Sequence, residues 1–305
     1  MFHIIIIHET TVPFMTVSTL HHQIDALYPG LSPKAQEAAR YIREHPAEIA
    51  LHGLRSAARK AGTSPASVLR LLQTLGFASW AEFQALHQQW LTEDRSAVFS
   101  RRAGDMVAHQ LGSESNLLLR LAEAETANAA SGLAEAQHPA LAKAADRLAT
   151  ATEIGILGLR SCHSVAYGLA YGLSLFRPGV RLIGGTGGMM LDEIDALPQG
   201  ATLVTISIAP YSRETVEATR HARSHGMGVI AVTDAPFGPL SRLSDITLTT
   251  TTDIPAHLAS VTGLVALCEG LTSLVLTRSG EAGLAALRLR ESRLSQRSAY
   301  LPPED

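Results

Sequence analysis

The sequence predicts two domains, an all-α domain followed by an α/β domain with a doubly wound parallel sheet. Between residues 31 and 77, short segments with helical apolar spacing are separated by Ser, Pro and Gly residues that start or stop helices. From residue 153 onward, short apolar runs alternate with helical segments, a pattern typical of parallel strands and their covering helices. The length of 305 residues also exceeds the usual size of one hydrophobic core.

Composition limits the classes of protein to be considered. A hydrophobic share of 46% with 17% charged residues is typical of a folded globular chain. The two cysteines, Cys162 and Cys268, cannot build a disulfide scaffold and lack zinc-finger spacing, so we expect a reducing cytoplasm and no metal. The apolar run over 4–7 is too short to span a membrane, and no membrane partner is expected.

Residues Met1 to Phe14 match no pattern that follows them, and Met15 precedes a more ordinary start. We therefore expect an N-terminal tail over 1–30 and a helical domain over 31–105. A helical linker over 106–130, an α/β domain over 131–295 and a C-terminal tail over 296–305 complete the predicted organisation.

In the helical domain, Ser32 and Pro33 suit the start of a helix that runs to about His45. A short helix over 48–51 and a helix over 54–61 follow. Gly62 then provides a left-handed cap, and Ser64-Pro65 opens the next helix. The residues expected to form its buried stripe are Val68, Leu69, Leu72 and Leu75.

Two short helices joined by a tight turn with Gly match the helix-turn-helix, whose second helix enters the DNA major groove. The stretch from Leu31 to Arg102 carries ten Lys/Arg against six Asp/Glu, a net +4 in a chain of net −3. Arg70 can form a bidentate contact with guanine, while the helix start can hold phosphates. The expected DNA contacts are Arg59, Lys60, Ser64, Ser67 and Arg70; an ordinary helical bundle remains the alternative.

The α/β domain is predicted from alternating segments that follow Ala-rich helices over 117–148. The last helix is apolar enough to suggest burial against a second subunit. Strands are expected over 153–159, 180–183, 202–208, 228–233 and 246–248, and helices over 164–176, 189–197, 213–225 and 256–278.

Ligands of doubly wound sheets bind beyond the carboxyl ends of the strands, and three loops there have unusual compositions. These loops, over 158–164, 184–188 and 207–215, are rich in hydroxyl groups or glycine. Hydroxyls and free backbone N–H groups at helix N-termini make an anion site, and Arg160 or Arg213 would add positive charge. Phosphate is therefore the expected ligand.

Two cofactor classes are disfavoured. No G-x-G-x-x-G motif follows a strand, and no acidic residue occurs between Leu175 and Gly185, where an NAD-binding fold would place one. A P-loop is also absent from the sequence, so nucleotide triphosphate hydrolysis is not expected. We predict no cofactor.

Together these segments resemble the RpiR/MurR family of bacterial transcription regulators over roughly residues 31–295. The resemblance is carried by Leu31-Ser32-Pro33, the stretch 57–77, the loop 158–166, and Ile206-Ser207 with Ser212-Arg213-Glu214-Thr215. It implies a helix-turn-helix domain joined to a sugar isomerase (SIS) domain. It also implies a regulator, more commonly a repressor, of a carbohydrate-metabolism operon. Such a regulator is a dimer or tetramer on double-stranded operator DNA, with a phosphorylated sugar or related acid as effector.

The resemblance assigns phosphate binding to hydroxyls of the first and third loops. The chain departs from the family at Arg160, at Cys162 near a usual serine position, at the Ala209-Pro210-Tyr211 insertion and at Arg213 in place of glycine. The expected ligand contacts are Arg160, Ser161, Cys162, Ser164, Gly185, Thr186, Ser207, Tyr211, Ser212, Arg213 and Thr215.

The alternative function is an enzyme, since other SIS domains isomerise sugar phosphates with a glutamate or histidine base. Candidate bases are His163, Glu193, Glu214, His257 and Glu269, each of which also has a structural explanation, so no catalytic residue is expected. A third alternative, a sugar-binding module that never touches DNA, would be indicated by a buried Arg70.

Overall fold

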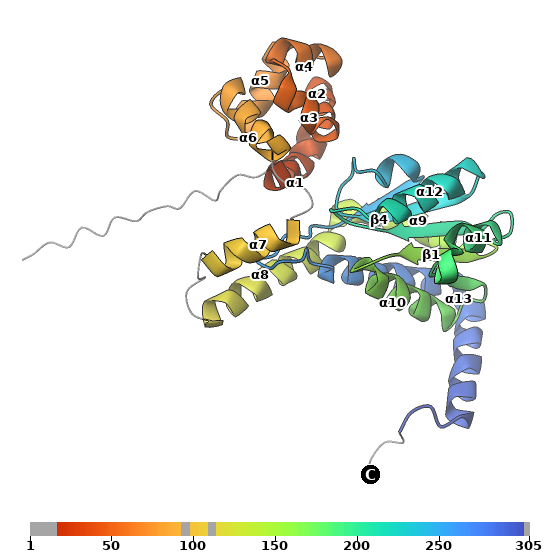
Figure 1. The fold of residues 1–305 in the computed structure, drawn as a ribbon. Coiled ribbons are helices and arrows are strands. Elements are labelled where there is room, and N and C mark those ends of the chain that lie inside the picture. The colour runs from red at the N-terminus through yellow and green to blue at the C-terminus, as the bar shows by residue number, and fades with distance from the viewer. Residues whose placement is uncertain (1–16, 93–97, 109–113, 302–305) are drawn as a thin grey trace, which may run out of the picture. The chain divides into compact units, whose positions relative to one another are not determined.

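The computed structural model describes residues 17–92, 98–108 and 114–301, which include every predicted site residue (Figure 1). The chain divides into two compact units, Met1–Asp94 and Arg95–Asp305. This division falls earlier than the boundary expected at residue 105, because α7 (Val98–Ala108) belongs to the second unit. The predicted unpatterned stretch Met1 to Phe14 lies outside the described residues.

The first unit is all-α, as predicted. Its helices are α1 (Val17–Leu27), α2 (Pro33–Glu44), α3 (Pro46–Leu51), α4 (Leu54–Lys60), α5 (Pro65–Thr74) and α6 (Trp80–Thr92). The tail predicted over 1–30 requires correction, since α1 contributes the fully buried Leu20 and Ile24 to the core of this unit. Asp25 of α1 also pairs with Arg43 of α2 at 2.7 Å.

The buried stripe of helix α5 differs from the predicted one at a single leucine. Val68, Leu72 and Leu75 are buried as expected, but Leu71 is buried in place of Leu69, which is 36% exposed. The observed spacing i, i+3, i+4, i+7 is that of a single helix face, which Leu69 cannot share. Leu69 consequently lies on the outer surface of α5, beside Arg70.

The second unit contains a parallel sheet of five strands in the order β2-β1-β3-β4-β5 within the described residues, which confirms the predicted α/β fold. The strands are β1 (Ile154–Gly158), β2 (Val180–Ile183), β3 (Thr202–Ile206), β4 (Gly228–Thr233) and β5 (Ile246–Thr249). The helices are α8 (Glu114–Gly132), α9 (His138–Thr150), α10 (Cys162–Ser174), α11 (Met190–Asp195), α12 (Arg213–Ser224) and α13 (Thr262–Gln296).

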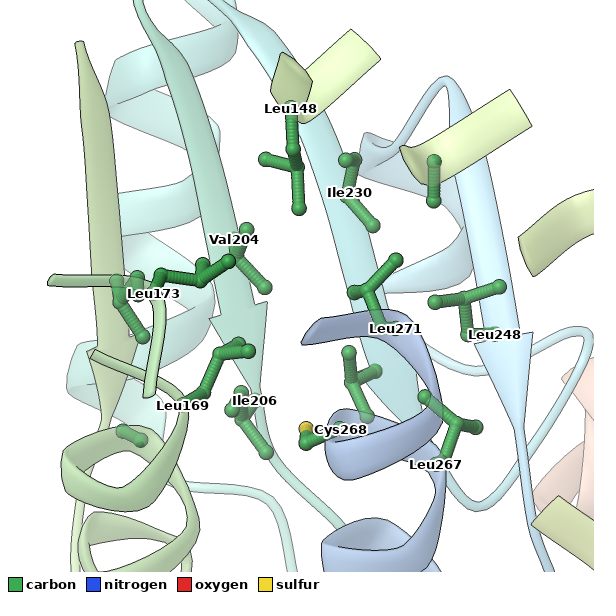
Figure 2. Close-up of a cluster of buried hydrophobic side chains, with 14 of the residues drawn as sticks. Leu148, Leu169, Leu173, Val204, Ile206, Ile230, Leu248, Leu267, Cys268 and Leu271 are labelled. Carbon is green, nitrogen blue, oxygen red and sulfur yellow. The ribbon is translucent and has the colours of Figure 1, made fainter. Parts of the chain in front are cut away.

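Helices cover both faces of this sheet. Helices α9, α10 and α13 pack against one face, where Leu169 and Leu173 of α10 meet Val204 of β3, and Leu271 of α13 lies near Ile230 of β4 (Figure 2). Helices α11 and α12 pack against the other face. Alternating residues of each strand point to opposite faces, which explains why continuous apolar runs form these strands.

The predicted linker over 106–130 is largely part of this unit. Helix α8 packs against α13, and a Cβ on its Gly132 would lie 2.6 Å from the carbonyl oxygen of Gly263. Only glycine permits this close approach of the two helices. Helix α13 continues beyond the predicted end at 278, with a local break at Gly280, where φ is +52°.

Candidate functional site

The sheet order creates a switch point between β1 and β3. The chain passes from β1 to β2 on one side and later returns to β3 on the other, and Gly158 at the end of β1 pairs with Ile206 at the end of β3. Helix connections therefore diverge at this position, which is where open α/β sheets of this strand order bind ligands. The first and third predicted loops lie on its two sides.

The first loop makes a tight passage from β1 into α10. A Cβ on Gly158 would lie 2.7 Å from the carbonyl oxygen of Cys162, so this strand end requires glycine. Arg160 adopts the left-handed conformation, with φ +56°, and its side chain is exposed. Ser161 precedes the helix without using its hydroxyl as a cap, and Ser164 donates to the Ser161 carbonyl at 3.0 Å. The Ser161 hydroxyl is thus exposed at a helix N-terminus.

Cys162 does not take the position predicted for it. Its side chain is 3% exposed and belongs to the core between α10 and the sheet. This burial raises the pKa of the thiol to about 11. Cys162 therefore acts as a small core residue, which corrects its assignment as a ligand contact.

Backbone N–H groups of the second loop are already hydrogen-bonded to a glutamate side chain of the same chain. Glu193 of α11 accepts hydrogen bonds from the backbone N–H of Gly184 at 2.8 Å and of Gly185 at 3.2 Å. The Gly185 N–H is consequently not free for a phosphate, which corrects its expected role. Thr186 follows in a short 3-10 turn, η4 (Thr186–Gly188), with an exposed side chain.

The third loop is held by a residue that the sequence analysis did not select. The Tyr211 hydroxyl donates to Asp234 Oδ1 at 2.6 Å, and the Ala209 N–H donates to Oδ2 at 3.2 Å. The peptide between Ala209 and Pro210 is cis. Asp234 directly follows β4, so the same rule that selected the three loops, the carboxyl end of a strand, also points to it.

Three buried hydroxyls gather where this loop enters α12. Ser212 caps the helix by accepting from the Thr215 N–H at 3.4 Å, and its own N–H donates to Ser207 Oγ at 3.3 Å. The exposures are 4% for Ser207, 7% for Ser212 and 0% for Thr215. Among the described residues, no partner satisfies the Thr215 hydroxyl oxygen. A buried hydroxyl in this state is suited to meeting an oxygen of a bound molecule. Arg213 at the start of α12 is exposed.

The five candidate bases do not share one location. Glu193 holds the second loop, and Glu214 lies on α12 with its carboxylate 3.5 Å from Ser212 Oγ. Glu269 and His257 are exposed, on α13 and before it respectively. His163 has Nδ1 3.3 Å from the Gly158 carbonyl oxygen, a contact within the first loop.

In the first unit, α4, a short turn and α5 form the predicted helix-turn-helix. Gly62 takes the left-handed conformation with φ +70°, and the Thr63 N–H donates back to the Ala58 carbonyl at 2.9 Å. Ser64 caps α5 by accepting from the Ser67 N–H at 3.1 Å. Of the predicted DNA contacts, Ser67 is half-buried, and the exposed residues are Arg59, Lys60, Ser64 and Arg70.

Part of the positive charge near the helix-turn-helix is neutralised by an ion pair. Lys60 forms an ion pair with Glu48 of α3, which raises the pKa of Lys60 and lowers that of Glu48. Arg70 extends from the exposed side of α5, so the alternative that rested on a buried Arg70 loses its support.

Comparisons with known proteins show which domain this chain contains and which proteins it is similar to. The model of the SIS domain matches residues 147–277, the span from late α9 to α13. The sugar isomerase domain of the RpiR transcription factor from Sphaerobacter thermophilus is similar, with 26% identity and a TM-score of 0.52 over 58% of this chain and 98% of that one. The chain contains a SIS domain and is similar to RpiR transcription regulators.

Two further relatives extend the match beyond the SIS domain. The HTH-type transcriptional regulator TTE0211 of Caldanaerobacter subterraneus subsp. tengcongensis is 24% identical over 71% of this chain and 74% of its own length. The NanR protein of Vibrio vulnificus, solved with ManNAc-6P, shares the fold over 91% of this chain and 98% of that one, with 22% identity and a TM-score of 0.50. Among the described residues, none of the helices has the length and apolar character needed to cross a membrane.

Proposed function

We propose that this protein is a DNA-binding transcription regulator of the RpiR type, whose SIS domain binds a phosphorylated sugar or a related sugar acid. The observation that carries the proposal is the group of buried hydroxyls Ser207, Ser212 and Thr215 at the β1/β3 switch point. A phosphate there would accept from these hydroxyls and from the exposed Ser161 at the start of α10. NanR was solved with ManNAc-6P, so phosphorylated amino sugars are among the first ligands to test.

The charged residues around these hydroxyls favour a particular mode of phosphate binding. Asp234 faces the third loop, but its two carboxylate oxygens accept from Tyr211 and from the Ala209 N–H, which disperses the negative charge. Arg160 and Arg213 are exposed at the two helix starts and can approach an anion without a prior desolvation cost. We therefore infer that the phosphate lies between the α10 and α12 N-termini, with Thr186 toward the sugar.

On the DNA side, α5 is the recognition helix. Arg70 and Leu69 are both exposed on it, so a bidentate contact with guanine can be accompanied by an apolar contact with a thymine methyl group. Ser64 and Arg59 lie close in sequence to the turn and would contact backbone phosphates, which position the helix but do not read sequence.

Control of transcription follows from assembly. In a symmetric dimer or tetramer, two recognition helices must lie about 34 Å apart to read half-sites separated by one DNA turn. A sugar phosphate that prefers one arrangement of the subunits changes that spacing, and its effect is limited by its differential affinity for the two states.

The protein is proposed to have no isomerase activity. The carboxylate of Glu193 is committed to the Gly184 and Gly185 N–H groups, and the other candidate bases are dispersed over separate elements. An aldose–ketose isomerisation needs a base within hydrogen-bond reach of the substrate carbons. We expect no interconversion of any sugar phosphate that binds.

The test is thermal melting of the full chain with a panel of sugar phosphates and sugar acids, each compared with its unphosphorylated form. A specific ligand at 100 times its Kd stabilises by about 2.7 kcal/mol, which gives a measurable rise in Tm. The proposal predicts a rise that requires the phosphate and is reduced by Ser161→Ala, with Ser273→Ala on α13 as the control. A rise caused only by unphosphorylated acids, or the same rise in Ser161→Ala, would contradict the proposed ligand class or site.

A further inference from the structure

A cluster of two histidines and one aspartate lies on the sheet face covered by α11 and α12. His221 is on the last turn of α12, His225 directly follows that helix, and Asp195 ends α11. One ligand atom from each side chain lies within 4.8 Å of the other two. Neither the proposed effector pocket nor the recognition helix uses these residues.

The orientation of His225 is set by the backbone. Its Nδ1 lies 2.9 Å from the carbonyl oxygen of His221, and because a carbonyl can only accept, Nδ1 carries the proton. The lone pair of the neutral ring is then on Nε2. Metal-binding histidines are commonly oriented in this way, by a hydrogen bond from the nitrogen that does not bind the metal.

His221 and Asp195 are already in contact. His221 Nε2 lies 2.6 Å from Asp195 Oδ1, which brings a nitrogen of α12 next to a carboxylate oxygen of α11. The rings of His221 and His225 lie with their centroids 4.3 Å apart. The ligand atoms of a tetrahedral zinc site are roughly 3.3 Å apart, so small side-chain rotations would complete the geometry.

We propose that Asp195, His221 and His225 bind a divalent transition-metal ion. Two imidazoles and one carboxylate suit Zn²⁺ and its neighbours, whereas Mg²⁺ and Ca²⁺ prefer sites made of oxygen. Asp195 and His225 are exposed and His221 is half-buried, so water can fill the fourth position.

The site would link two segments that lead to the effector pocket. Helix α11 carries Glu193, which holds the Gly184-Gly185 loop, and α12 begins at the Ser212 cap. A metal that joins the ends of α11 and α12 therefore restricts the movement of the elements that bear both loops. The metal site itself depends only on the three ligands and stands independently of the proposed effector.

The test is titration of the metal-depleted full chain, prepared without a polyhistidine tag, with ZnCl₂ in competition with a chromophoric chelator. The variants are His225→Ala and Asp195→Asn, and His138→Ala, an exposed histidine at the start of α9, is the matched control. Circular dichroism of each variant verifies that the helices remain folded.

We expect His225→Ala and Asp195→Asn each to weaken one zinc equivalent at least tenfold, while His138→Ala leaves it unchanged. In CoCl₂-loaded protein, the visible absorption of nitrogen-coordinated Co²⁺ should be lost in His225→Ala. Zinc affinity and stoichiometry that are the same in wild type, His225→Ala and Asp195→Asn would overturn the proposal, as would MgCl₂ binding at these residues as tightly as ZnCl₂. Either outcome would mean that His221 and Asp195 form an ion pair and no metal site.

Discussion

The Tyr211 hydroxyl lies 2.6 Å from Asp234 Oδ1 and joins the loop after β3 to the end of β4. Gly238 makes this contact possible, because a Cβ there would lie 2.6 Å from the Tyr211 hydroxyl oxygen. The same carboxylate accepts from the Ala209 N–H, so both ends of the inserted Ala209-Pro210-Tyr211 segment are attached to one residue. Asp234 is therefore a positioning residue for the loop over 207–215.

Tyr211→Phe removes one hydrogen bond to a partly buried carboxylate. Hydrogen bonds to charged groups contribute about 1.5–3 kcal/mol when buried, so we expect a loss of about 1 kcal/mol in the free energy of unfolding of the second unit. Urea unfolding followed by circular dichroism measures it. Tyr171 is an exposed residue whose hydroxyl makes a long contact of 3.4 Å with the Tyr300 hydroxyl, so Tyr171→Phe should cost less than about 0.5 kcal/mol. Equal effects of the two variants would show that Asp234 does not hold the loop.

Thr215→Val separates a ligand role from a structural role. Within the described part of the chain, the hydroxyl oxygen of Thr215 is buried without a partner. An unsatisfied buried polar group costs about 1–3 kcal/mol, so its removal should leave the free protein at least as stable as wild type. The rise in Tm caused by the effector should nevertheless fall. A variant that loses stability but keeps the full ligand response would place Thr215 in the structure only.

Much of this arrangement is predictable from the sequence, and the exceptions have physical causes. Parallel strands are buried on both faces and appear as continuous apolar runs, so the segment over 153–159 identified β1 directly. Cys162 was misassigned because it falls near a usual serine position of the resembled family, whereas helical spacing turns this residue toward the core. Glu193 and the pair His221–Asp195 depend on contacts between separate elements, which no local pattern reports.

Glu48→Gln is expected to strengthen DNA binding. The carboxylate of Glu48 pairs with Lys60 at the end of α4, so its removal frees a cation near the recognition helix and removes a repulsive charge. We expect a gain of about twofold to fivefold in affinity at low salt that disappears as salt is raised. Fluorescence anisotropy with a labelled duplex measures it, with Glu281→Gln on α13 as a control for net charge. An unchanged affinity at low salt would remove Lys60 from the interface.

We expect His87 to make the first unit less stable in acid. Burial against Phe83 lowers the pKa of His87 below its usual 6.5, so the unfolded chain binds the proton more readily than the native one. Protonation of His87 therefore leaves the free energy of unfolding unaffected above pH 6.5 and lowers it as the pH falls below this value. Both tryptophans of the chain, Trp80 and Trp90, lie on α6, so their fluorescence reports the unfolding of this unit. His87→Leu should reduce the dependence between pH 6.5 and 5; an identical dependence in the variant would exclude His87 as its origin.

The most direct test of the central claim measures DNA binding and ligand response in the same variants. Duplexes selected by the wild-type protein from a random pool provide the operator, and the active sugar phosphate from the melting panel provides the effector. Arg70→Ala should weaken operator binding by about 10-fold to 100-fold, equivalent to 1–3 kcal/mol, while the effector still raises Tm. Thr215→Val should bind the operator normally but lose the effect of the sugar phosphate on that binding. If Arg70→Ala binds the operator as well as wild type, or if the sugar phosphate leaves wild-type operator binding unchanged, the chain is not a regulator of the kind proposed.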